Sequence, residues 1–465
     1  MAQLTFRGAA REVTGSCHVL HVNGKTVVLD AGLFQGRRAE VRAKNEALPV
    51  DPHTIDAIVL SHAHIDHAGR LPFLSRLGYT GPIFATTATR DLCRVMLADA
   101  AYIQEKDAEF LAKRKREHQD PLYDRGDAER VTAAMRPHGY GEWVGVCDGV
   151  RAMFVDAGHI LGSASVVLEW TEGGSHTRLA FSGDIGRSGQ SIIRDPVPPG
   201  DVDAIIMEST YGNRDHPAMG GGRDALAAIV TATAARGGKV LIPAFAVGRT
   251  QEIIYSLHAL VRDGRIPRIP VVIDSPLAIE ATRVFTQHAE VFDGREPLIR
   301  AFGASPEAAL ENPMVSFAET VDASKEAMQR HGPMIIVAAS GMVESGRILH
   351  HLLHGASDPK NTILIVGFQA EHTLGRRIVE RRPMLKVLGE EVPLRARVEV
   401  LNGYSAHGDR GELVRWHEAV RQSSPRYRHT WLVHGEPDAQ DALEQTLTAL
   451  GARATCPRPG DVGHV

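Results

Sequence analysis

The stretch that decides the fold is His62-Ala63-His64-Ile65-Asp66-His67, which comes just after the apolar run Ile55–Leu60. It places three histidines and one aspartate within six residues, between an expected strand and an expected helix. Imidazole and carboxylate side chains together suit zinc and similar divalent cations. A lone histidine is more often structural, but a cluster this dense predicts a metal site.

Further ligands must come from elsewhere in the chain, because six adjacent residues cannot enclose two ions. His159, Asp184 and His434 each stand just after an apolar run that reads as a strand. Taken singly, either histidine is more often structural and Asp184 more often a turn residue. Their value as ligands therefore depends on their lying near the histidine cluster.

Composition describes an ordinary soluble protein. The chain has 465 residues, 43% of them hydrophobic and 23% charged, which is comfortable for two domains. No apolar run approaches the roughly 20 residues of a membrane helix, and the start lacks signal-peptide features, so we expect a cytoplasmic protein. The four cysteines form no CxxC pair, which argues against both a disulfide framework and a cysteine zinc site.

Charge gives little support to nucleic acid binding. The net charge is −4, whereas proteins that contact many phosphates are usually basic. The basic run at 113–116 could supply a local patch, although such runs are usually solvated helix faces.

The order of elements predicts two kinds of α/β architecture. The first third mixes short strands with helix, whereas strand and helix alternate after about Asp203, which is typical of a parallel sheet covered by helices. Short strands return at Arg397–Leu401 and Thr430–Val433. Phosphate-loop and GxGxxG motifs are missing from the sequence, so nucleotide-cofactor folds lose their main signature.

In order and context the polar residues resemble the four motifs of the metallo-β-lactamase superfamily. Asp30 matches the first motif, His62–His67 the second, His159 the third and Asp184 the fourth. The resemblance implies an αββα sandwich and a two-metal mechanism with a hydroxide between the ions. It also implies ligand roles: one ion on His62, His64 and His159, the other on Asp66, His67 and His434, with Asp184 bridging them and Asp30 orienting the histidine loop.

The segment between the fourth motif and His434 resembles the inserted domain of the β-CASP nucleases, a family that includes the endonuclease subunit of pre-mRNA cleavage factors. Motif A falls on Glu208, motif B on His407 and motif C on His434. The resemblance, closest to short bacterial members, implies a metallo-β-lactamase domain at 1–207 and 371–465 and a β-CASP α/β domain at 208–370. His372 departs from it, since relatives commonly carry glycine there, and we interpret it as a loop substitution.

Catalytic roles follow from the same resemblance. Asp66, Asp184, Glu208 and His407 are the expected catalytic residues. A cleaved phosphodiester releases an alkoxide that needs a proton, and a histidine oriented by a carboxylate can donate one. Glycine-bearing strand-to-helix turns let backbone N–H groups approach a phosphate, which makes Arg249, Ser340 and Gly341 the candidate phosphate contacts.

The leading hypothesis is a ribonuclease that uses two zinc ions, for which manganese could substitute. It would cut single-stranded RNA endonucleolytically, with 5′-to-3′ trimming as a further activity. The sequence does not decide between a monomer and a homodimer, and no membrane partner is expected. Two alternatives remain: a hydrolase of small esters, thioesters or lactams, and a non-catalytic RNA-processing scaffold. The inserted domain disfavours the first alternative, and the full set of ligands disfavours the second.

Overall fold

The computed structural model describes residues 2–36, 38–113, 120–216, 220–293, 314–367, 369, 372–401 and 405–465. The chain forms two compact units. Unit 1 comprises Met1–Ser188, Arg194–Asp215 and His407–Val465, and unit 2 comprises Gly189–Ile193 and His216–Ala406. Arg114–Arg116 of the basic run lie outside the described residues.

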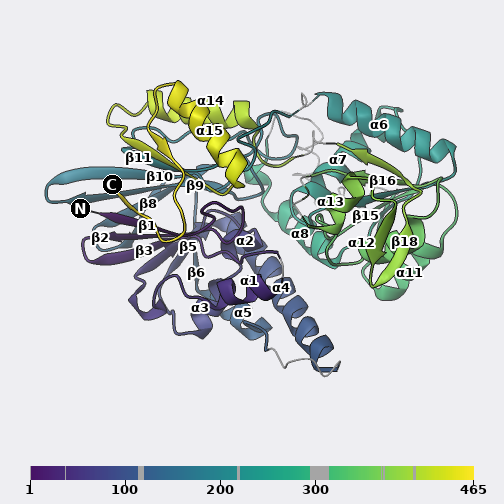
Figure 1. The fold of residues 1–465 in the computed structure, drawn as a ribbon, viewed down its shortest axis with the longest axis horizontal. Helices are drawn as coiled ribbons and strands as arrows, with labels where there is room; N and C mark the ends of the chain where they lie inside the picture. The colour runs from purple at the N-terminus through teal and green to yellow at the C-terminus, as the bar shows by residue number, and fades with distance from the viewer. Residues whose placement is uncertain are drawn as a thin grey trace. The chain divides into compact units, whose positions relative to one another are not determined.

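Unit 1 is built on two seven-stranded sheets (Figure 1). In spatial order, the first sheet comprises β22 (Val462–His464), β1 (Gln3–Gly8), β2 (Cys17–Val22), β3 (Lys25–Leu29), β4 (Ala57–Val59), β5 (Ile83–Thr86) and β6 (Met135–His138). The second comprises β21 (Ala454–Thr455), β20 (His429–Val433), β11 (Ala204–Glu208), β10 (Ser175–Phe181), β9 (Ala164–Glu172), β8 (Val150–Asp156) and β7 (Trp143–Cys147).

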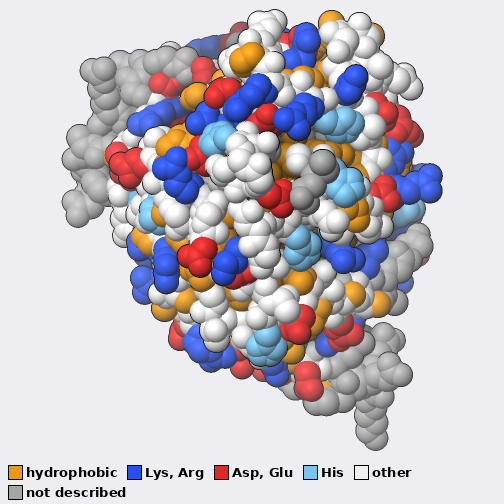
Figure 2. Space-filling view, turned by 90° about the vertical axis from the view of Figure 1, so that its left-hand side faces the viewer, with side chains coloured by type: hydrophobic (Ala, Val, Ile, Leu, Met, Phe, Trp, Pro, Cys, Tyr) orange, Lys and Arg blue, Asp and Glu red, His pale blue; other side chains and the backbone are white. Residues whose placement is uncertain are grey.

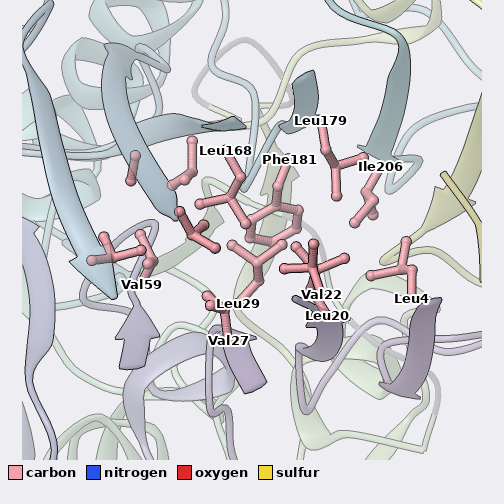
Figure 3. Packing of buried hydrophobic residues seen from close by; sticks show 14 of the residues in the cluster. Leu4, Leu20, Val22, Val27, Leu29, Val59, Leu168, Leu179, Phe181 and Ile206 are labelled. Atoms are coloured by element: carbon pink, nitrogen blue, oxygen red, sulfur yellow. The ribbon is translucent and has the colours of Figure 1, made fainter. Parts of the chain in front are cut away.

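The inner faces of these two sheets pack on each other. Leu20 and Leu29 from the first sheet meet Leu168, Phe181 and Ile206 from the second, and all five are buried (Figure 3). Fully burying one side chain of this size contributes about 1.5–3 kcal/mol. This shared core fixes the two sheets face to face, and with them the loops at their edges.

Helices cover both outer faces of the sheet pair. Beside the first sheet lie α2 (Ile65–Ala68), α3 (Leu71–Arg76), α4 (Thr87–Lys113) and α5 (Arg125–Ala134), and this part of the chain also holds α1 (Arg38–Glu46) and the 3-10 turn Pro52–Thr54. Against the second sheet pack α14 (Arg410–Gln422) and α15 (Pro437–Ala449). The predicted αββα sandwich is therefore confirmed.

Unit 2 contains a six-stranded sheet in which every pair of neighbours is parallel. Its strand order is β14 (Val315–Phe317), β13 (Val271–Ile273), β15 (Met334–Ala338), β12 (Lys239–Pro243), β16 (Thr362–Ile365) and β19 (Arg397–Val400). Near-continuous apolar runs such as Met334–Ala338 suit strands buried on both faces, as parallel sheets require. The predicted parallel sheet of the inserted domain is confirmed.

The remaining described elements of unit 2 are helices and one hairpin. The helices are α6 (Gly220–Ala235), α7 (Arg249–Arg262), α8 (Pro276–Gln287), α11 (Val321–Gln329), α12 (Ile348–Gly355) and α13 (Leu374–Val379), with a 3-10 turn at Ala289–Val291. The hairpin pairs β17 (Met384–Val387) with β18 (Glu390–Pro393). Among the described residues, no helix combines the length and apolarity needed to cross a membrane.

Strand β19 lies in the segment 371–465 that the resemblance places in the metallo-β-lactamase domain. In the structure it pairs in parallel with β16 inside unit 2. A short apolar run indicates a strand but does not indicate its partner strand. The sequence alone therefore could not assign β19 to a sheet. The domain boundaries expected from the sequence, 1–207 with 371–465 and 208–370, remain predictions.

Candidate metal centre

The histidine cluster lies in a loop whose backbone is held from several sides. The loop follows β4, and α2 starts within it at Ile65. The backbone N–H groups of His67 and Ala68 both donate to the carbonyl of His64, which makes the first turn of α2. The neighbouring loop fixes the turn, because Ala31 N–H donates to the carbonyl of His67. These hydrogen bonds fix the backbone of the loop, and the side chains of the histidine cluster therefore project from a rigid support.

Three imidazoles and one carboxylate converge in the first half of the site. His64 Nδ1 lies 3.1 Å from His62 Nε2 and 3.2 Å from His159 Nε2. Asp184 Oδ2 lies 3.5 Å from the Nε2 atoms of both His62 and His159. Four ligand atoms at 2.0–2.1 Å from one tetrahedral zinc ion would lie about 3.3 Å apart. These separations therefore fit one ion.

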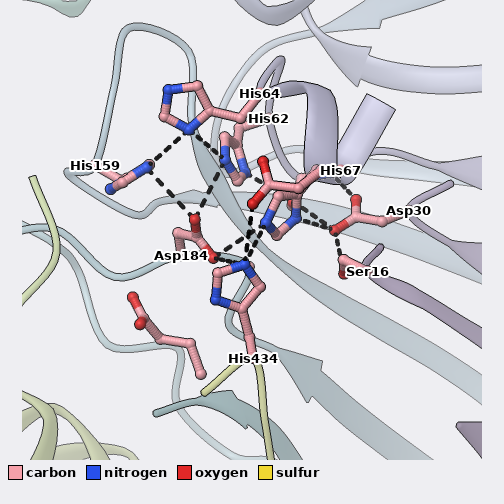
Figure 4. Close-up of polar contacts among 12 residues, drawn as sticks. Ser16, Asp30, His62, His64, His67, His159, Asp184 and His434 are labelled. Carbon is pink, nitrogen blue, oxygen red and sulfur yellow. Dashed lines mark hydrogen bonds and ion pairs between the residues drawn. The ribbon is translucent and has the colours of Figure 1, made fainter. Parts of the chain in front are cut away.

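The second half gathers Asp66 with His67 and His434, of which the two histidines are labelled in Figure 4. His67 Nε2 and His434 Nε2 lie 3.1 Å apart, and Asp66 Oδ2 is 3.5 Å from His434 Nε2. The other oxygen of Asp184, Oδ1, lies 3.2 Å from His67 Nε2 and 3.6 Å from His434 Nε2. Asp184 thus presents one carboxylate oxygen to each group of ligands.

The charge states of the first group of ligands suit metal binding. Burial is the main reason why the pKa values of His62 and His159 fall well below the usual range and that of His64 falls to about 4. These rings are therefore neutral at pH 7, the form that coordinates metal. Burial alone would raise the pKa of Asp184, but His434 and His67 outweigh it and hold that carboxyl ionised.

The surroundings of Asp184 also suit a cation. Its Oδ1 is buried and accepts no hydrogen bond from the described residues, and its neighbours are the Nε2 atoms of His67 and His434, which are candidate ligands themselves. A buried carboxylate oxygen without a donor costs about 1–3 kcal/mol or more, so such atoms usually serve a ligand. The donor set of histidines and aspartates fits a divalent ion of the zinc class.

Asp30 holds His67 in place from behind. Its Oδ2 lies 2.6 Å from His67 Nδ1 and accepts hydrogen bonds from the hydroxyls of Ser16 and Ser61, while Oδ1 accepts from the N–H of Ser61. Burial opposes the charged form of His67, but the carboxylates of Asp184 and Asp30 raise its pKa well above the usual range. With Nδ1 engaged by Asp30, Nε2 faces the ligand group. Asp30 therefore has the geometry of the predicted orienting residue.

Glu208 and His407 also come together, at the edge of the ligand group. Glu208 ends β11 and is fully buried, and its Oε1 lies 3.1 Å from His407 Nδ1. The N–H groups of Ile185 and Thr210 donate to the same carboxylate. Burial lowers the pKa of His407, but Glu208 and then Asp184 more than offset it and raise it to about 9. His407 is thus a cation at neutral pH.

Sequence reasoning missed some of the residues that support the ligands. The hydroxyl of Thr210 lies 3.1 Å from His434 Nδ1 and donates to the carbonyl of His434. Ser61 directly precedes the histidine cluster, and Thr210 stands two residues after Glu208, so proximity to a motif could have suggested both. No local signal marked Ser16.

The candidate phosphate contacts belong to unit 2, whereas all the residues above belong to unit 1. Arg249 begins α7 after β12, and Ser340 and Gly341 follow β15, which is the neighbouring parallel strand. The two turns touch, because a Cβ built on Gly341 would lie 2.6 Å from the ring of Phe245. Parallel strands bring both turns to the carboxyl edge of the sheet, where ligands of α/β folds commonly bind.

His372 lies in an exposed turn of unit 2. Its φ is +67°, a backbone conformation that favours glycine. The conformation agrees with its interpretation as a substitution in a loop.

Family models match three consecutive parts of the chain. The metallo-beta-lactamase superfamily matches residues 10–216, the Beta-Casp domain residues 250–378, and the Zn-dependent metallo-hydrolase RNA specificity domain residues 391–457.

Individual proteins match over nearly the full length. A ribonuclease of Thermus thermophilus is 40% identical over 98% of both chains. The transcription termination factor FttA of Methanosarcina mazei is 31% identical over 94% of this chain and 67% of its own. A solved structure of a protein of unknown function from Enterococcus faecalis has the same fold, with a TM-score of 0.56, 10% identity and 99% coverage of both chains. The chain therefore belongs to the β-CASP ribonuclease family of the metallo-β-lactamase superfamily, and it is a hydrolase that depends on a metal cofactor.

Proposed function

We propose that this protein is a zinc-dependent ribonuclease that hydrolyses phosphodiester bonds of single-stranded RNA with two metal ions. The observation that carries the proposal is the position of Asp184, which lies between two groups of ligands and offers one oxygen to each. A single-ion site would need only one of these groups. The ribonuclease relative and the matched RNA specificity domain support RNA as the substrate.

In this proposal His62, His64 and His159 would hold one ion and Asp66, His67 and His434 the other, with Asp184 shared between them. When bound, the ions would supply a lower pKa for the attacking water and positive charge beside the scissile phosphate. The chain keeps the ligands in position through Asp30 behind His67 and Thr210 behind His434. Manganese suits the same ligands, so the identity of the metal is part of the proposal.

His407 acts as the general acid for the leaving oxygen. Glu208 engages Nδ1, which leaves Nε2 as the ring nitrogen that carries the proton to the substrate. The negative charge of Glu208 favours the protonated ring, and the two backbone donors keep Glu208 from turning away. A positioned acid of this kind contributes about 10²–10⁴-fold to the rate.

Arg249, Ser340 and Gly341 are the proposed contacts to substrate phosphates. Arg249 is buried at the first turn of α7, so its backbone is fixed where the helix N-terminus favours anions. The hydroxyl of Ser340 accepts from the N–H groups of Glu344 and Ser345, which ties the turn together.

Basic and acidic side chains are interspersed on the face shown in Figure 2, in keeping with the net charge of −4. That face therefore offers no broad basic area, and we assign phosphate binding to specific turns. The homodimer, the cytoplasmic location and the 5′-to-3′ trimming activity remain predictions.

The test is cleavage of matched 5′-labelled single-stranded RNA and DNA by protein of known metal content, with and without chelator. Cleavage of RNA only, lost with chelator and in an Asp184→Asn variant, is the expected result. Two bound ions with both polymers intact would favour a small-molecule hydrolase. Absence of bound metal after supplementation with zinc and manganese would favour a scaffold.

A further inference from the structure

The loop between β1 and β2, residues Ala9–Ser16, contacts ligand-bearing segments from two distant parts of the chain. The N–H of His434 donates to the carbonyl of Ala9 at 2.6 Å, and the N–H of Gly435 donates to the carbonyl of Glu12 at 3.3 Å. At the other end of the loop, the N–H of Ser16 donates to the carbonyl of Asp66 at 2.8 Å. The β1–β2 loop therefore bridges the backbones of Asp66 and His434.

The loop has a defined and costly backbone conformation. Ala9 and Arg11 have φ values of +48° and +58°, which L-residues rarely adopt. Gly15 has φ +79°, and a Cβ there would lie 2.5 Å from the ring of Phe34. Backbone strain of this kind persists only where the surroundings hold it in place.

Arg11 fastens the loop to the helix that follows His434, with contacts to Asp441 and, from Nη1 at 3.4 Å, to the side-chain oxygen of Gln440. Arg11 makes a two-pronged ion pair with Asp441, with Nη2 donating to Oδ2 at 3.0 Å and Nη1 to Oδ1 at 2.5 Å. Asp441 lies on α15, which begins at Pro437. The neighbouring Gln440 donates from Nε2 to the carbonyl of Gly435. Arg11 is thus linked through the first turn of α15 to the segment that carries His434.

We propose that the β1–β2 loop, fastened by Arg11 and Asp441, sets the separation of Asp66 and His434 and thereby the affinity of that half of the site for its ion. The inference rests on the two-ion function proposed above. Among the hydrogen bonds of the described residues, none joins this loop to His62, His64 or His159. Loss of the Arg11–Asp441 contact loosens the loop at its His434 end, whereas the N–H of Ser16 still holds the backbone of Asp66 and with it the histidine loop. It should therefore weaken the ion of the Asp66, His67 and His434 group and spare the other.

Loss of the Arg11–Asp441 ion pair should change metal affinity more than it changes folding stability. The side chains of Arg11 and Asp441 are 26% and 50% exposed, and ion pairs this exposed contribute little to folding. Residues that position metal ligands, in contrast, commonly change metal affinity about 10–100-fold when they are replaced. A contact that only stabilised the fold would not change metal affinity while leaving stability nearly unchanged.

The experiment is a titration of metal-free protein with Zn²⁺ in competition with a chromogenic chelator. Asp441→Asn should bind its tighter ion as wild type does and its weaker ion about tenfold less tightly. The matched control is Asp201→Asn, since Asp201 pairs with Arg178 at 2.7 Å and the two side chains have nearly the same exposure, 49% and 26%. That variant should bind both ions normally.

Two further variants complete the test. Arg11→Ala should reproduce the defect, and the double variant Arg11→Ala/Asp441→Asn should be no worse than Arg11→Ala, because Asp441 acts through Arg11. Wild-type protein that binds fewer than two ions would overturn the proposed function and this inference with it. Two ions in wild type with unchanged affinities in Asp441→Asn would overturn the inference alone.

Discussion

At the scale of single residues, the Glu208–His407 pair makes a prediction about pH. Replacing Glu208 by Gln keeps an oxygen for the N–H of Ile185 and for His407 but removes the charge that raises the pKa of His407. His407 should then lose its proton at lower pH, so the alkaline fall of kcat should move to lower pH. His407→Ala should lose that fall, and kcat should drop about 10²–10⁴-fold with metal content unchanged.

Measurement of kcat against pH, with metal quantified in each variant, checks the assignment of the acid. If His407→Ala lost its metal instead, His407 would be a ligand, as its position beside Asp184 and Glu208 also allows. If the alkaline fall of kcat stayed at the same pH in Glu208→Gln, Glu208 would not be the group that raises the pKa of His407.

His18 makes a second residue-scale prediction. Its ring is fully buried between the edges of Phe6 and Phe181, and neither nitrogen has a hydrogen-bond partner among the described residues. Burial lowers its pKa to about 3, against 6.5 in an unfolded chain. The unfolded state therefore takes up the proton first, and this group reduces stability as pH falls from about 6.5 toward 3.

His18→Phe should remove that loss. The free energy of unfolding of the variant, relative to wild type, should be roughly 2 kcal/mol higher at pH 5 than at pH 8. Urea unfolding of chelator-treated protein at the two pH values measures it. A gain that did not depend on pH would mean that His18 contributes only through packing.

Residues whose types carry chemistry were the easiest to predict. His62, His159, Asp184 and His434 stand at strand ends and have side chains that can offer a ligand atom, so residue type and position alone made them candidates. Thr210 was not predicted, because a threonine hydroxyl becomes informative only when its neighbour across the fold is known.

At the scale of elements, the turn after β3 makes a prediction about packing. A Cβ built on Gly32 would lie 1.6 Å from the carbonyl oxygen of Asp66, which is backbone and cannot turn aside. Gly32→Ala should therefore displace the histidine loop, lowering both metal content and Tm. Overpacking of this kind costs about 1–3 kcal/mol. Gly145→Ala in β7 is the matched control, since its Cβ would meet nothing within 4 Å.

Metal analysis and thermal melts of the two glycine variants decide the point. A Gly32→Ala protein with normal metal content would show that the histidine loop adapts to the displacement.

Elements were predicted well where the local pattern is strong. The central strands of unit 2, such as Val271–Ile273 and Met334–Ala338, are apolar runs buried on both faces. Pairing was harder, as β19 shows, because the choice of sheet is made by contacts far along the chain.

At the scale of the whole molecule, no local pattern could bring the ligands together. His67 and His434 lie 367 positions apart in the sequence, yet their Nε2 atoms lie 3.1 Å apart. The sandwich achieves this because β20 pairs with β11, which places the loop after β20 beside Glu208 and Thr210. Only the resemblance to a known motif order anticipated that meeting.

The division into two units makes a prediction about metal removal. The four tryptophans, Trp143, Trp170, Trp416 and Trp431, all belong to unit 1, as does the metal centre. A ligand that binds only the folded state stabilises it, by about 2.7 kcal/mol at 100 times its Kd. Chelation should therefore lower the midpoint of unfolding followed by tryptophan fluorescence, and added Zn²⁺ should restore it in a concentration-dependent way.

Unit 2 provides the internal comparison for this measurement. Hydrogen exchange of the amides in β12 and β15 reports on its parallel sheet, which holds none of the proposed ligands. Their protection should change far less on chelation than that of β4 and β20, which lead into the histidine loop and His434. Equal loss of protection in both units would mean that they unfold as one cooperative body. In that case the metal centre would stabilise the whole chain rather than the sandwich that contains it.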